Sequence, residues 1–348
     1  MSSQEKTGTC KPLPVCFAYL NEVIILSNGE VTTCCFDAKG ENSLGNVNEM
    51  PLQRLWEERV LAWHRKNVAA NKRRAAWESA LCRKCLANRY MTSFDAKVTD
   101  DPHLLRSFHM PEHPLPVLML VEVSSACNFS CWGCYAGLRE LNRGKRFFDM
   151  ESFERNILPV VPRMERIRPF FYGEPFLHPR IGQIIRLLRK AGPRVSIHIS
   201  TNGMVMNHGI TEVLVEERVN YLIVSLHGGH RQEGLLRYAR QGPDIEVIRE
   251  NIGRIVRLKR ERGKGLPWIF LKALLFDWND SSEEMEAFLE FGRELGADFT
   301  GWDLNMSDPS FSSRRVVPGS AAYDALVRNR LLDSNFYELP AWPTDDEA

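Results

Sequence analysis

Short apolar runs alternate with longer amphipathic stretches along the chain beyond residue 117. The runs are rich in β-branched and aromatic residues, as buried strands are, whereas the stretches repeat apolar residues at helical spacing. This alternation predicts βαβ units that build a parallel sheet. The predicted strands are Leu118–Val123, Arg168–Tyr172, Val195–Ser200, Tyr221–Ser225, Trp268–Leu275 and Phe299–Leu304. The predicted helices are Glu151–Val160, Ile181–Ala191, Ile210–Glu217, Ile245–Glu261 and Ser281–Leu295.

A β-hairpin is predicted near the N-terminus. The apolar run Val23–Leu26 and the run Val31–Thr33 flank the dipeptide Asn28-Gly29. Asn-Gly between two such runs is a strong hairpin signal, because both residues tolerate the positive φ that a tight turn requires. We expect the hairpin to bring Cys16 and Cys34 towards each other across its base.

The composition is that of an ordinary globular protein. Of the 348 residues, 44% are hydrophobic and 26% are charged, and the net charge is +1. A charge this close to zero gives no general attraction to nucleic acid. No apolar stretch is long enough to cross a bilayer, and the N-terminal residues lack the apolar core of a secretory signal. We therefore expect a cytoplasmic protein with no membrane or nucleic-acid partner.

The cysteines carry the candidate chemistry. All nine lie within the first 134 residues, and three read Cys127-x-x-x-Cys131-x-x-Cys134 directly after the predicted strand Leu118–Val123. Iron–sulfur cubes that carry electrons are usually held by four thiolates. Three thiolates on one loop can bind three irons of a [4Fe–4S] cube and leave the fourth iron open. An open iron indicates a cluster that does chemistry.

This loop and four later segments resemble the radical S-adenosylmethionine (SAM) superfamily. The segment from Phe171 to Pro179 is similar to the family's Gly-Gly-Glu-Pro motif, with Tyr172 in place of the first glycine. The resemblance extends over roughly residues 117–305. The other three segments, in the family's order, are Ile199-Ser200-Thr201-Asn202-Gly203, Val224-Ser225-Leu226-His227-Gly228 and Arg240-Gln241-Gly242.

The resemblance implies the fold class, α/β with a partial (β/α)6 TIM-like barrel, and the cofactors. It implies that Cys127, Cys131 and Cys134 hold a [4Fe–4S] cluster and that SAM chelates the open iron. In such barrels the reacting groups gather at the carboxyl ends of the strands, where the cysteine loop also falls. The implied SAM contacts are Tyr135, Gly173, Glu174, Ser200, Asn202, Ser225 and Arg240.

A second cysteine set, upstream, resembles the SPASM/twitch auxiliary-cluster domain of the same superfamily. Its pattern is a cysteine, an Asn-Gly turn, a cysteine, a Gly-Asn turn, a helix bearing Trp, which would fall at Leu52–Trp56, and Cys-x-x-Cys. The resemblance implies a small α+β domain with a second [4Fe–4S] cluster on Cys16, Cys34, Cys82 and Cys85. In the family this domain usually follows the barrel, whereas here it precedes it.

Two alternatives to that cluster need stating. A four-thiolate zinc site suits the same residues. Disulfides are disfavoured, because no export signal is present. Cys10 and Cys35 are left over. The simplest interpretation of both is a thiol without a metal, and each is also a candidate hydrogen donor.

The segment boundaries follow from composition. We expect residues 1–100 to form the auxiliary domain, 101–116 a proline-rich linker, 117–306 the barrel, and 307–348 a C-terminal extension without regular structure. Ser196 and His198 share strand parity with Ser200, and Tyr221 shares it with Ser225, so these side chains should face the barrel interior.

Polar residues inside apolar strands are the candidate substrate contacts. Each is equally well explained as a structural hydrogen-bonding partner, since burial without a partner is costly. Together they indicate a polar substrate. The candidates within or at the ends of the strands are Glu122, His198, Lys272, Asp303 and Asn305, with the thiols of Cys10 and Cys35 as further catalytic candidates.

The function implied is radical SAM chemistry on a small polar metabolite, such as a sugar or aminocyclitol, or on a peptide. One auxiliary cluster favours oxidation, because it can accept the second electron. Epimerisation and peptide maturation are alternatives, and a non-catalytic iron–sulfur or zinc scaffold is an alternative of another class. We also expect an electron donor such as flavodoxin or ferredoxin.

Overall fold

A computed structural model describes residues 22–32, 34–35, 37–63, 118–144, 146–305, 309–317, 319–329 and 331–332. The strands are β1 (Glu22–Ile25), β2 (Val31–Thr32), β3 (Leu118–Val121), β4 (Arg166–Arg168), β5 (Ser196–Thr201), β6 (Tyr221–Ser225), β7 (Trp268–Leu275) and β8 (Phe299–Leu304). The α-helices are α2 (Leu52–Leu55), α8 (Met150–Ser152), α9 (Ile181–Ala191), α10 (His208–Glu216), α11 (Gln232–Tyr238), α12 (Ile245–Glu261), α13 (Ser282–Leu295) and α14 (Ala321–Arg328).

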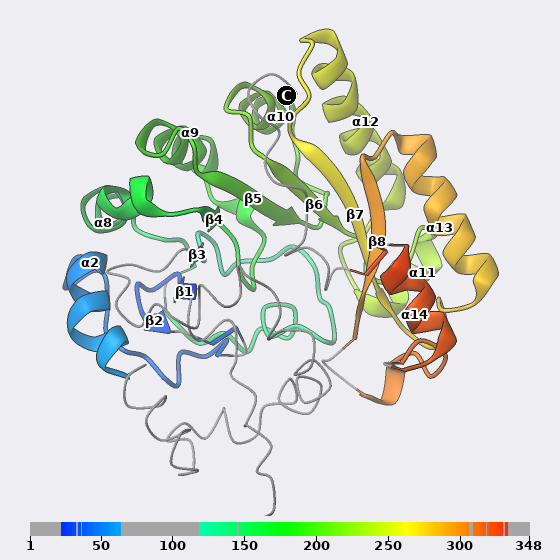
Figure 1. The fold of residues 1–348 in the computed structure, drawn as a ribbon, viewed down its shortest axis with the longest axis horizontal. Helices are drawn as coiled ribbons and strands as arrows, with labels where there is room; N and C mark the ends of the chain where they lie inside the picture. Colours follow the sequence, from blue (N-terminus) through cyan, green and yellow to red (C-terminus); the bar gives the residue numbers. More distant parts are fainter. Residues whose placement is uncertain are drawn as a thin grey trace, which may run out of the picture.

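Eight strands form one curved sheet in the order β2-β1-β3-β4-β5-β6-β7-β8, and every neighbouring pair except β1–β2 is parallel. The six strands β3 to β8 are the predicted partial barrel. Figure 1 shows α9, α10, α12 and α13 along the outer side of the curve. The α/β fold class is therefore confirmed.

The predicted hairpin is present and extends the barrel sheet. Ile24 pairs with Thr32 across the hairpin, and Gly29 at its turn has a φ of +90°. Strand β1 also runs parallel to β3, with Glu22 opposite Leu118 and Ile25 opposite Val121. The N-terminal segment thus continues the sheet. The expected boundary at residues 101–116 lies outside the described residues and stays a prediction.

The two faces of the sheet differ in character. On the outer face, Ile197 and Ile199 of β5 belong to one buried cluster with Leu188 of α9, since alternate residues of a strand point to one side. On the inner face, the ring of His198 lies 4.5 Å from that of Tyr221. Tyr221 in turn lies 5.1 Å from Trp268. The inner face is therefore partly polar and aromatic.

Two predicted elements differ from the observed ones at positions next to prolines. The strand predicted at 168–172 is wrong in position, because β4 ends at Arg168, before Pro169, and proline cannot donate to a strand ladder. The helix predicted at 151–160 is only partly correct. After α8 the chain makes a π-helical turn (Phe153–Ile157) and then a 3₁₀ helix (Leu158–Arg163), which contains Pro159 and Pro162.

The sequence analysis did not predict helices α11 and α14. Helix α11 lies in a polar stretch with little apolar periodicity. Helix α14 begins after Ser320, whose side chain accepts a hydrogen bond from the Tyr323 backbone. The prediction of an unstructured C-terminal extension was therefore wrong for these eight residues. Among the described residues, no helix is both long enough and apolar enough to cross a membrane.

Candidate functional site

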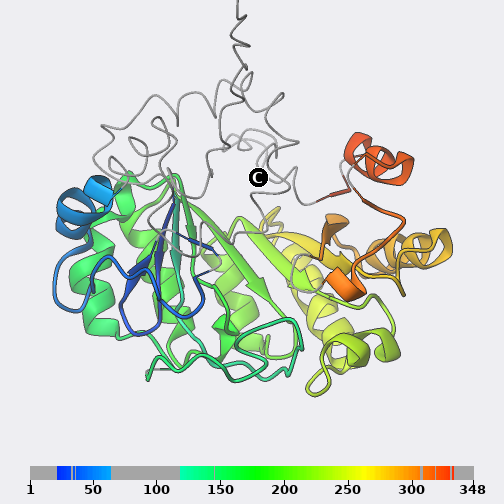
Figure 2. The same cartoon turned by 90° about the horizontal axis from the view of Figure 1, so that it is seen from below.

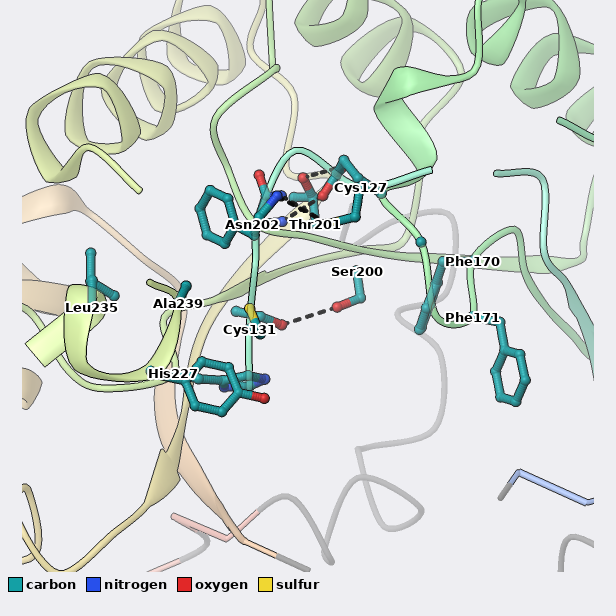
Figure 3. A pocket seen from close by; sticks show the side chains of 15 residues that line it. Cys127, Cys131, Phe170, Phe171, Ser200, Thr201, Asn202, His227, Leu235 and Ala239 are labelled. Atoms are coloured by element: carbon teal, nitrogen blue, oxygen red, sulfur yellow. Dashed lines mark hydrogen bonds between the residues drawn. The ribbon is translucent and has the colours of Figure 1, made fainter. Parts of the chain in front are cut away.

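A pocket opens at the carboxyl ends of the central strands, beneath the cysteine loop (Figure 3). The loop supplies Cys127, Phe129 and Cys131, and the segment after β4 supplies the motif that contains Gly173 and Glu174. The ends of β5 and β6 and the end of α11 complete the lining. The remaining lining residues are Phe170, Phe171, Ser200, Thr201, Asn202, Ser225, His227, Leu235, Tyr238 and Ala239.

Three glycines allow the cysteine loop to pack tightly on its neighbours. A Cβ atom on Gly173 would lie 2.0 Å from the Ser124 carbonyl oxygen. On Gly137 it would lie 2.5 Å from the backbone nitrogen and oxygen of Cys131, and on Gly242 2.4 Å from the Asn128 carbonyl oxygen. Each of these contacts is to backbone, so no side chain could move aside. The glycine in the Gly-Glu-Pro segment is thus required by close approach to the loop.

Backbone hydrogen bonds fix the loop against the end of α11. Cys131 forms an antiparallel bridge with Ala239, and the Trp132 amide donates to the Tyr238 carbonyl at 3.3 Å. The Ser130 amide donates to the Gln241 carbonyl at 3.1 Å. The loop therefore behaves as an added strand, which holds the middle cysteine in one place.

The three thiols lie in surroundings that suit a bound cluster. Burial raises the pKa of the Cys127 thiol to about 11, and it also raises the pKa of Cys131 and Cys134. Bare thiolates are therefore disfavoured here, and positively charged irons would offset that cost. The Phe129 amide donates to Cys127 Sγ at 3.4 Å, a contact that can tune a cluster ligand.

No three His, Cys, Asp or Glu side chains of the described segments converge as ligands of a single ion. A cube does not require such convergence, because it takes each thiolate on a different iron. Three half-buried thiols on one rigid loop beside a pocket therefore fit a cluster with an open iron better than they fit a zinc ion.

Glu174 connects the cysteine loop to the end of β5. Its carboxylate accepts hydrogen bonds from Thr201 Oγ1 at 2.8 Å and from the Asn202 amide at 2.8 Å. It also accepts one from the Phe176 amide at 3.2 Å, while its own amide donates to the Ala126 carbonyl at 2.8 Å. Burial raises the pKa of Glu174 to about 7 in spite of these donors.

Five of the seven predicted SAM contacts line the pocket: Gly173, Glu174, Ser200, Asn202 and Ser225. Ser200 Oγ and Ser225 Oγ lie 3.1 Å apart, a pair that Figure 3 shows with a dashed line. Asn202 Nδ2 lies 3.9 Å from Cys127 Sγ and donates to Asn128 Oδ1 at 2.8 Å. Hydroxyl and amide groups thus face the space next to the first cysteine.

The other two predicted SAM contacts lie outside that lining. Tyr135 is 37% exposed, and its ring packs on that of Tyr172 at 5.6 Å. Arg240 is exposed, and its backbone amide donates to the Ser130 carbonyl at 3.3 Å. Neither side chain lines the pocket, so the SAM contacts of Tyr135 and Arg240 stay predictions.

Three polar side chains of the pocket were not among the predicted site residues: Thr201, His227 and Tyr238. The rings of His227 and Tyr238 lie 5.3 Å apart, edge to face. Burial, with the nearby Lys272 ammonium, lowers the pKa of His227 to about 3, and its Nδ1 has no hydrogen-bond partner among the described residues. His227 has the strand parity of Ser225, which is the signal that could have identified it.

Glu122 has the structural role that the sequence left open. It is fully buried, and its carboxylate accepts from Arg143 Nη2 at 2.5 Å and from the Ser27 amide at 3.0 Å. Arg143 Nη1 also donates to the Ala38 carbonyl at 2.5 Å. The pair therefore fastens the segment after the hairpin to the barrel. Glu122 does not line the pocket, but its carboxylate also accepts from the Tyr172 amide at 3.4 Å, next to the lining residue Gly173.

The remaining substrate candidates lie on the inner face or near it. His198 Nε2 lies 2.6 Å from Ser196 Oγ, and both side chains are buried. Lys272 Nζ lies 3.7 Å from Asp303 Oδ2 on the neighbouring strand. Asn305 is buried at the end of β8. None of these lines the pocket, and their catalytic roles stay predictions.

Only part of the auxiliary cysteine set can be placed. Cys34 and Cys35 are half-buried, and Cys35 packs against a small buried cluster with Ile24 and Leu120. The Tyr172 hydroxyl donates to the Cys35 carbonyl at 3.5 Å, which brings this segment close to the Gly-Glu-Pro motif. The predicted ligands Cys16, Cys82 and Cys85, and also Cys10, lie outside the described residues.

Two family models match the chain. Residues 121–288 match the model of the radical SAM superfamily, and residues 16–86 match that of SPASM, an iron–sulfur cluster-binding domain. The second match lies ahead of the first, as the cysteine patterns predicted.

Individual proteins show more distant similarity. The chain is similar to the S-adenosyl-L-methionine-dependent 2-deoxy-scyllo-inosamine dehydrogenase of Niallia circulans, with 26% identity over 117 residues. That match covers 32% of this chain and 46% of the dehydrogenase. It is also similar to the tungsten-containing aldehyde ferredoxin oxidoreductase cofactor-modifying protein of Pyrococcus furiosus, with 23% identity over 164 residues. That match covers 43% of this chain and 46% of the relative. The matches thus span less than half of each relative. Streptococcus suis SuiB bound to S-adenosylmethionine has a TM-score of 0.47 at 15% identity, over 72% of this chain and 60% of that one.

Proposed function

Because the chain belongs to the radical SAM superfamily, we propose that it is an enzyme that oxidises a small polar metabolite of the aminocyclitol type. Membership implies a [4Fe–4S] cluster and SAM as cofactors, and the SPASM domain implies auxiliary iron–sulfur binding. When bound, the cluster supplies the electron that cleaves SAM to methionine and a 5′-deoxyadenosyl radical, which takes a hydrogen atom from the substrate. The observation that carries the proposal is the three-thiol loop beside a pocket whose mainly apolar lining also presents hydroxyl and amide groups.

The residues of the chain have separate tasks in this proposal. Cys127, Cys131 and Cys134 would hold the cluster. Ser200, Ser225 and Asn202 offer hydroxyl and amide groups to the ribose and the amino-acid part of SAM. Charges and polar groups held in one geometry orient the reacting parts, so that the radical forms next to the substrate.

The apolar part of the lining would protect the radical. Phe129, Phe170 and Leu235 form apolar walls, and Tyr238 presents most of its surface as an aromatic ring. Such walls exclude water and keep weakly bound hydrogen donors away from a reactive intermediate. The three loop thiols, of which Cys127 and Cys131 line the pocket, would be ligated, so they could not donate hydrogen.

Two features support oxidation of a polar metabolite. The relative from Niallia circulans is a dehydrogenase of an aminocyclitol. The inner face of the sheet carries the Lys272–Asp303 pair, whose charged groups can bind hydroxyl or amino substituents. The second electron of such an oxidation would pass to the auxiliary cluster, which the SPASM match implies.

The test is an anaerobic assay with reconstituted protein, SAM, dithionite and 2-deoxy-scyllo-inosamine deuterated at the carbon to be oxidised. We expect deuterium in 5′-deoxyadenosine and a product that has lost two hydrogens. A product of unchanged mass that carries one solvent deuterium would instead indicate epimerisation. SAM cleavage without any labelled 5′-deoxyadenosine would reject this substrate class while leaving the SAM chemistry in place.

A further inference from the structure

The hydroxyl of Tyr238 is a buried polar group of the pocket that has no protein partner. Tyr238 is the last residue of α11, lines the pocket and is only 6% exposed. Its ring packs against those of Trp132 and Phe276 at 5.4 Å and against that of His227 at 5.3 Å. In the part of the chain that the structure describes, its hydroxyl forms no hydrogen bond. Such a group is costly unless something in the pocket bonds to it.

The surroundings of this hydroxyl include the thiols of the cysteine loop. Burial raises the pKa of Tyr238, and the charges of Cys131, Cys134 and Cys127 raise it further, in that order. Cys127 and Cys131 also pack against the buried aromatic cluster that contains Tyr238. The middle cysteine is therefore the loop thiol that acts most strongly on this hydroxyl.

The three thiols differ in the hydrogen-bond donors around them. The Phe129 amide donates to Cys127 Sγ at 3.4 Å. Burial raises the pKa of Cys134, and hydrogen bonds from the backbone amides at 136–137 act against that rise. For Cys131, burial and then the charges of the other two thiolates raise the pKa, and no donor among the described residues acts against them. The middle thiol thus lacks the donor that its two neighbours have.

We propose that the Tyr238 hydroxyl donates a hydrogen bond to a cluster sulfur on the Cys131 side and thereby raises the reduction potential of the cluster. This inference rests on the proposed function, because it requires a cluster on the loop. Ligated sulfurs can only accept hydrogen bonds, whereas a phenol can donate one. A donated bond stabilises the reduced cluster more than the oxidised one, because reduction adds a negative charge. Tyr238 therefore makes the cluster easier to reduce.

Tyr238→Phe tests the proposal, because it removes the hydroxyl and keeps the ring. Tyr221→Phe is the matched control, since Tyr221 is equally buried but lies at the start of β6, outside the pocket lining. The reconstituted proteins are titrated anaerobically without SAM, and the electron paramagnetic resonance of the reduced clusters is recorded. The signal of the loop cluster is the one that Cys131→Ala abolishes.

We expect Tyr238→Phe to lower the equilibrium constant for reduction of the loop cluster about tenfold, which is about 59 mV for one electron. Tyr221→Phe should change it by less than about twofold. Electron–nuclear double resonance in D2O measures the hydrogen bond directly. The wild-type loop cluster should show a coupling to an exchangeable deuteron that Tyr238→Phe lacks.

Urea unfolding of the metal-free chain separates this role from a structural one. Metal-free Tyr238→Phe should unfold at the same urea concentration as wild type or at a higher one, because the hydroxyl has no protein partner to lose. A lower urea midpoint for the variant would show that the hydroxyl bonds to the protein and would overturn the proposal.

Two further results would overturn it. An unchanged potential and an unchanged deuteron coupling in Tyr238→Phe would mean that the hydroxyl does not reach the cluster. An unchanged potential together with weaker SAM binding would make SAM the partner instead. Failure of the proposed function is distinguishable from both. A wild-type loop cluster that cleaves no SAM would reject that function, while a lowered potential in Tyr238→Phe would still support the hydrogen bond.

Discussion

At the residue scale, Glu174 is a structural link in the site. Its carboxylate accepts from the Thr201 hydroxyl and from the Asn202 and Phe176 amides. It thereby holds the end of β5 against the cysteine loop, and the side-chain Nδ2 of the same Asn202 lies 3.9 Å from Cys127 Sγ. The resemblance to the Gly-Gly-Glu-Pro motif predicted that Glu174 is part of the site. It could not predict that the carboxylate oxygens of Glu174 accept hydrogen bonds from the protein itself.

Glu174→Gln should destabilise the metal-free protein by about 1–3 kcal/mol, because the new amide group would face the donor N–H of Asn202. The difference from wild type should depend on pH. The folded-state pKa of about 7 lies above the ordinary glutamate pKa of about 4.5, so the folded protein holds the proton more tightly. Wild-type stability from this group is therefore present at low pH and lost as the pH rises from about 4.5 to 7.

Denaturant unfolding of wild type and Glu174→Gln at several pH values tests this sign. The gap in unfolding free energy should narrow by up to about 3 kcal/mol between about pH 4 and pH 8, since glutamine does not titrate. A gap that widens over that interval would show that the three donors dominate over burial and keep the carboxylate charged.

Replacing either residue of the buried ion pair Glu122–Arg143 should strongly lower the free energy of unfolding. We expect Glu122→Gln or Arg143→Met to lower the unfolding free energy by about 3–5 kcal/mol, because each leaves an uncompensated buried group. The double variant should lose less than the sum of the two.

The exposed pair Arg155–Glu151 is the matched control for that experiment. Its atoms lie 2.9 Å apart, but the side chains are 60% and 80% exposed. Arg155→Met should therefore cost less than about 0.5 kcal/mol in the same urea titration. Additive losses in the Glu122/Arg143 double variant would mean that the two side chains do not stabilise each other.

At the scale of elements, close backbone packing fixes the cysteine loop. Gly173→Ala should displace the loop, because the new Cβ would lie 2.0 Å from the Ser124 carbonyl oxygen. We expect the reconstituted variant to hold markedly less iron than wild type, with the loss measured by iron analysis and cluster absorbance.

Gly209→Ala in α10 is the control for that glycine. Its new Cβ would meet only Asn207 Oδ1 at 3.6 Å, an ordinary contact. The variant should keep its iron and gain about 0.5–1 kcal/mol of stability, since alanine favours a helix more than glycine does. Wild-type iron content in Gly173→Ala would contradict the role given to this close approach.

Strongly periodic elements were predictable from the sequence, whereas the irregular ones were not. Strands β6, β7 and β8 have the predicted bounds, and so does α12, because apolar alternation and helical periodicity are clear there. Strand β4 was misplaced, since aromatic residues after Pro169 resemble a strand but line the pocket region instead. Helix α11 depends on tertiary contacts with the cysteine loop, which no local pattern reveals.

At the scale of the whole molecule, distant segments meet at one edge of the sheet. The pocket combines the loop after β3 with the ends of β5 and β6 and with α11. Motif order predicted most of this set. The unexpected feature is that the hairpin strand β1 pairs directly with β3 (Figure 2), so Cys34 belongs to a segment fastened to the barrel. Sequence patterns give no information on such pairing between distant strands.

Two clusters per chain should be measurable as iron. We predict about eight irons per reconstituted chain, two cubes of four, if Cys16, Cys34, Cys82 and Cys85 hold the auxiliary cluster. Replacing Cys127, Cys131 and Cys134 together by alanine should leave about half of that iron. If the triple variant keeps zinc and no iron, the four-thiolate zinc site is correct instead.

The most direct test of the central claim is formation of 5′-deoxyadenosine by the anaerobically reconstituted protein with SAM and dithionite. The wild type should produce it, and Cys131→Ala should not, because the loop would then lack its middle thiolate. Substitution of Cys35, which is not among the predicted ligands of either cluster, should leave this activity in place. If the wild type forms no 5′-deoxyadenosine, or if Cys131→Ala forms as much as the wild type, the assignment of this loop to SAM cleavage is wrong.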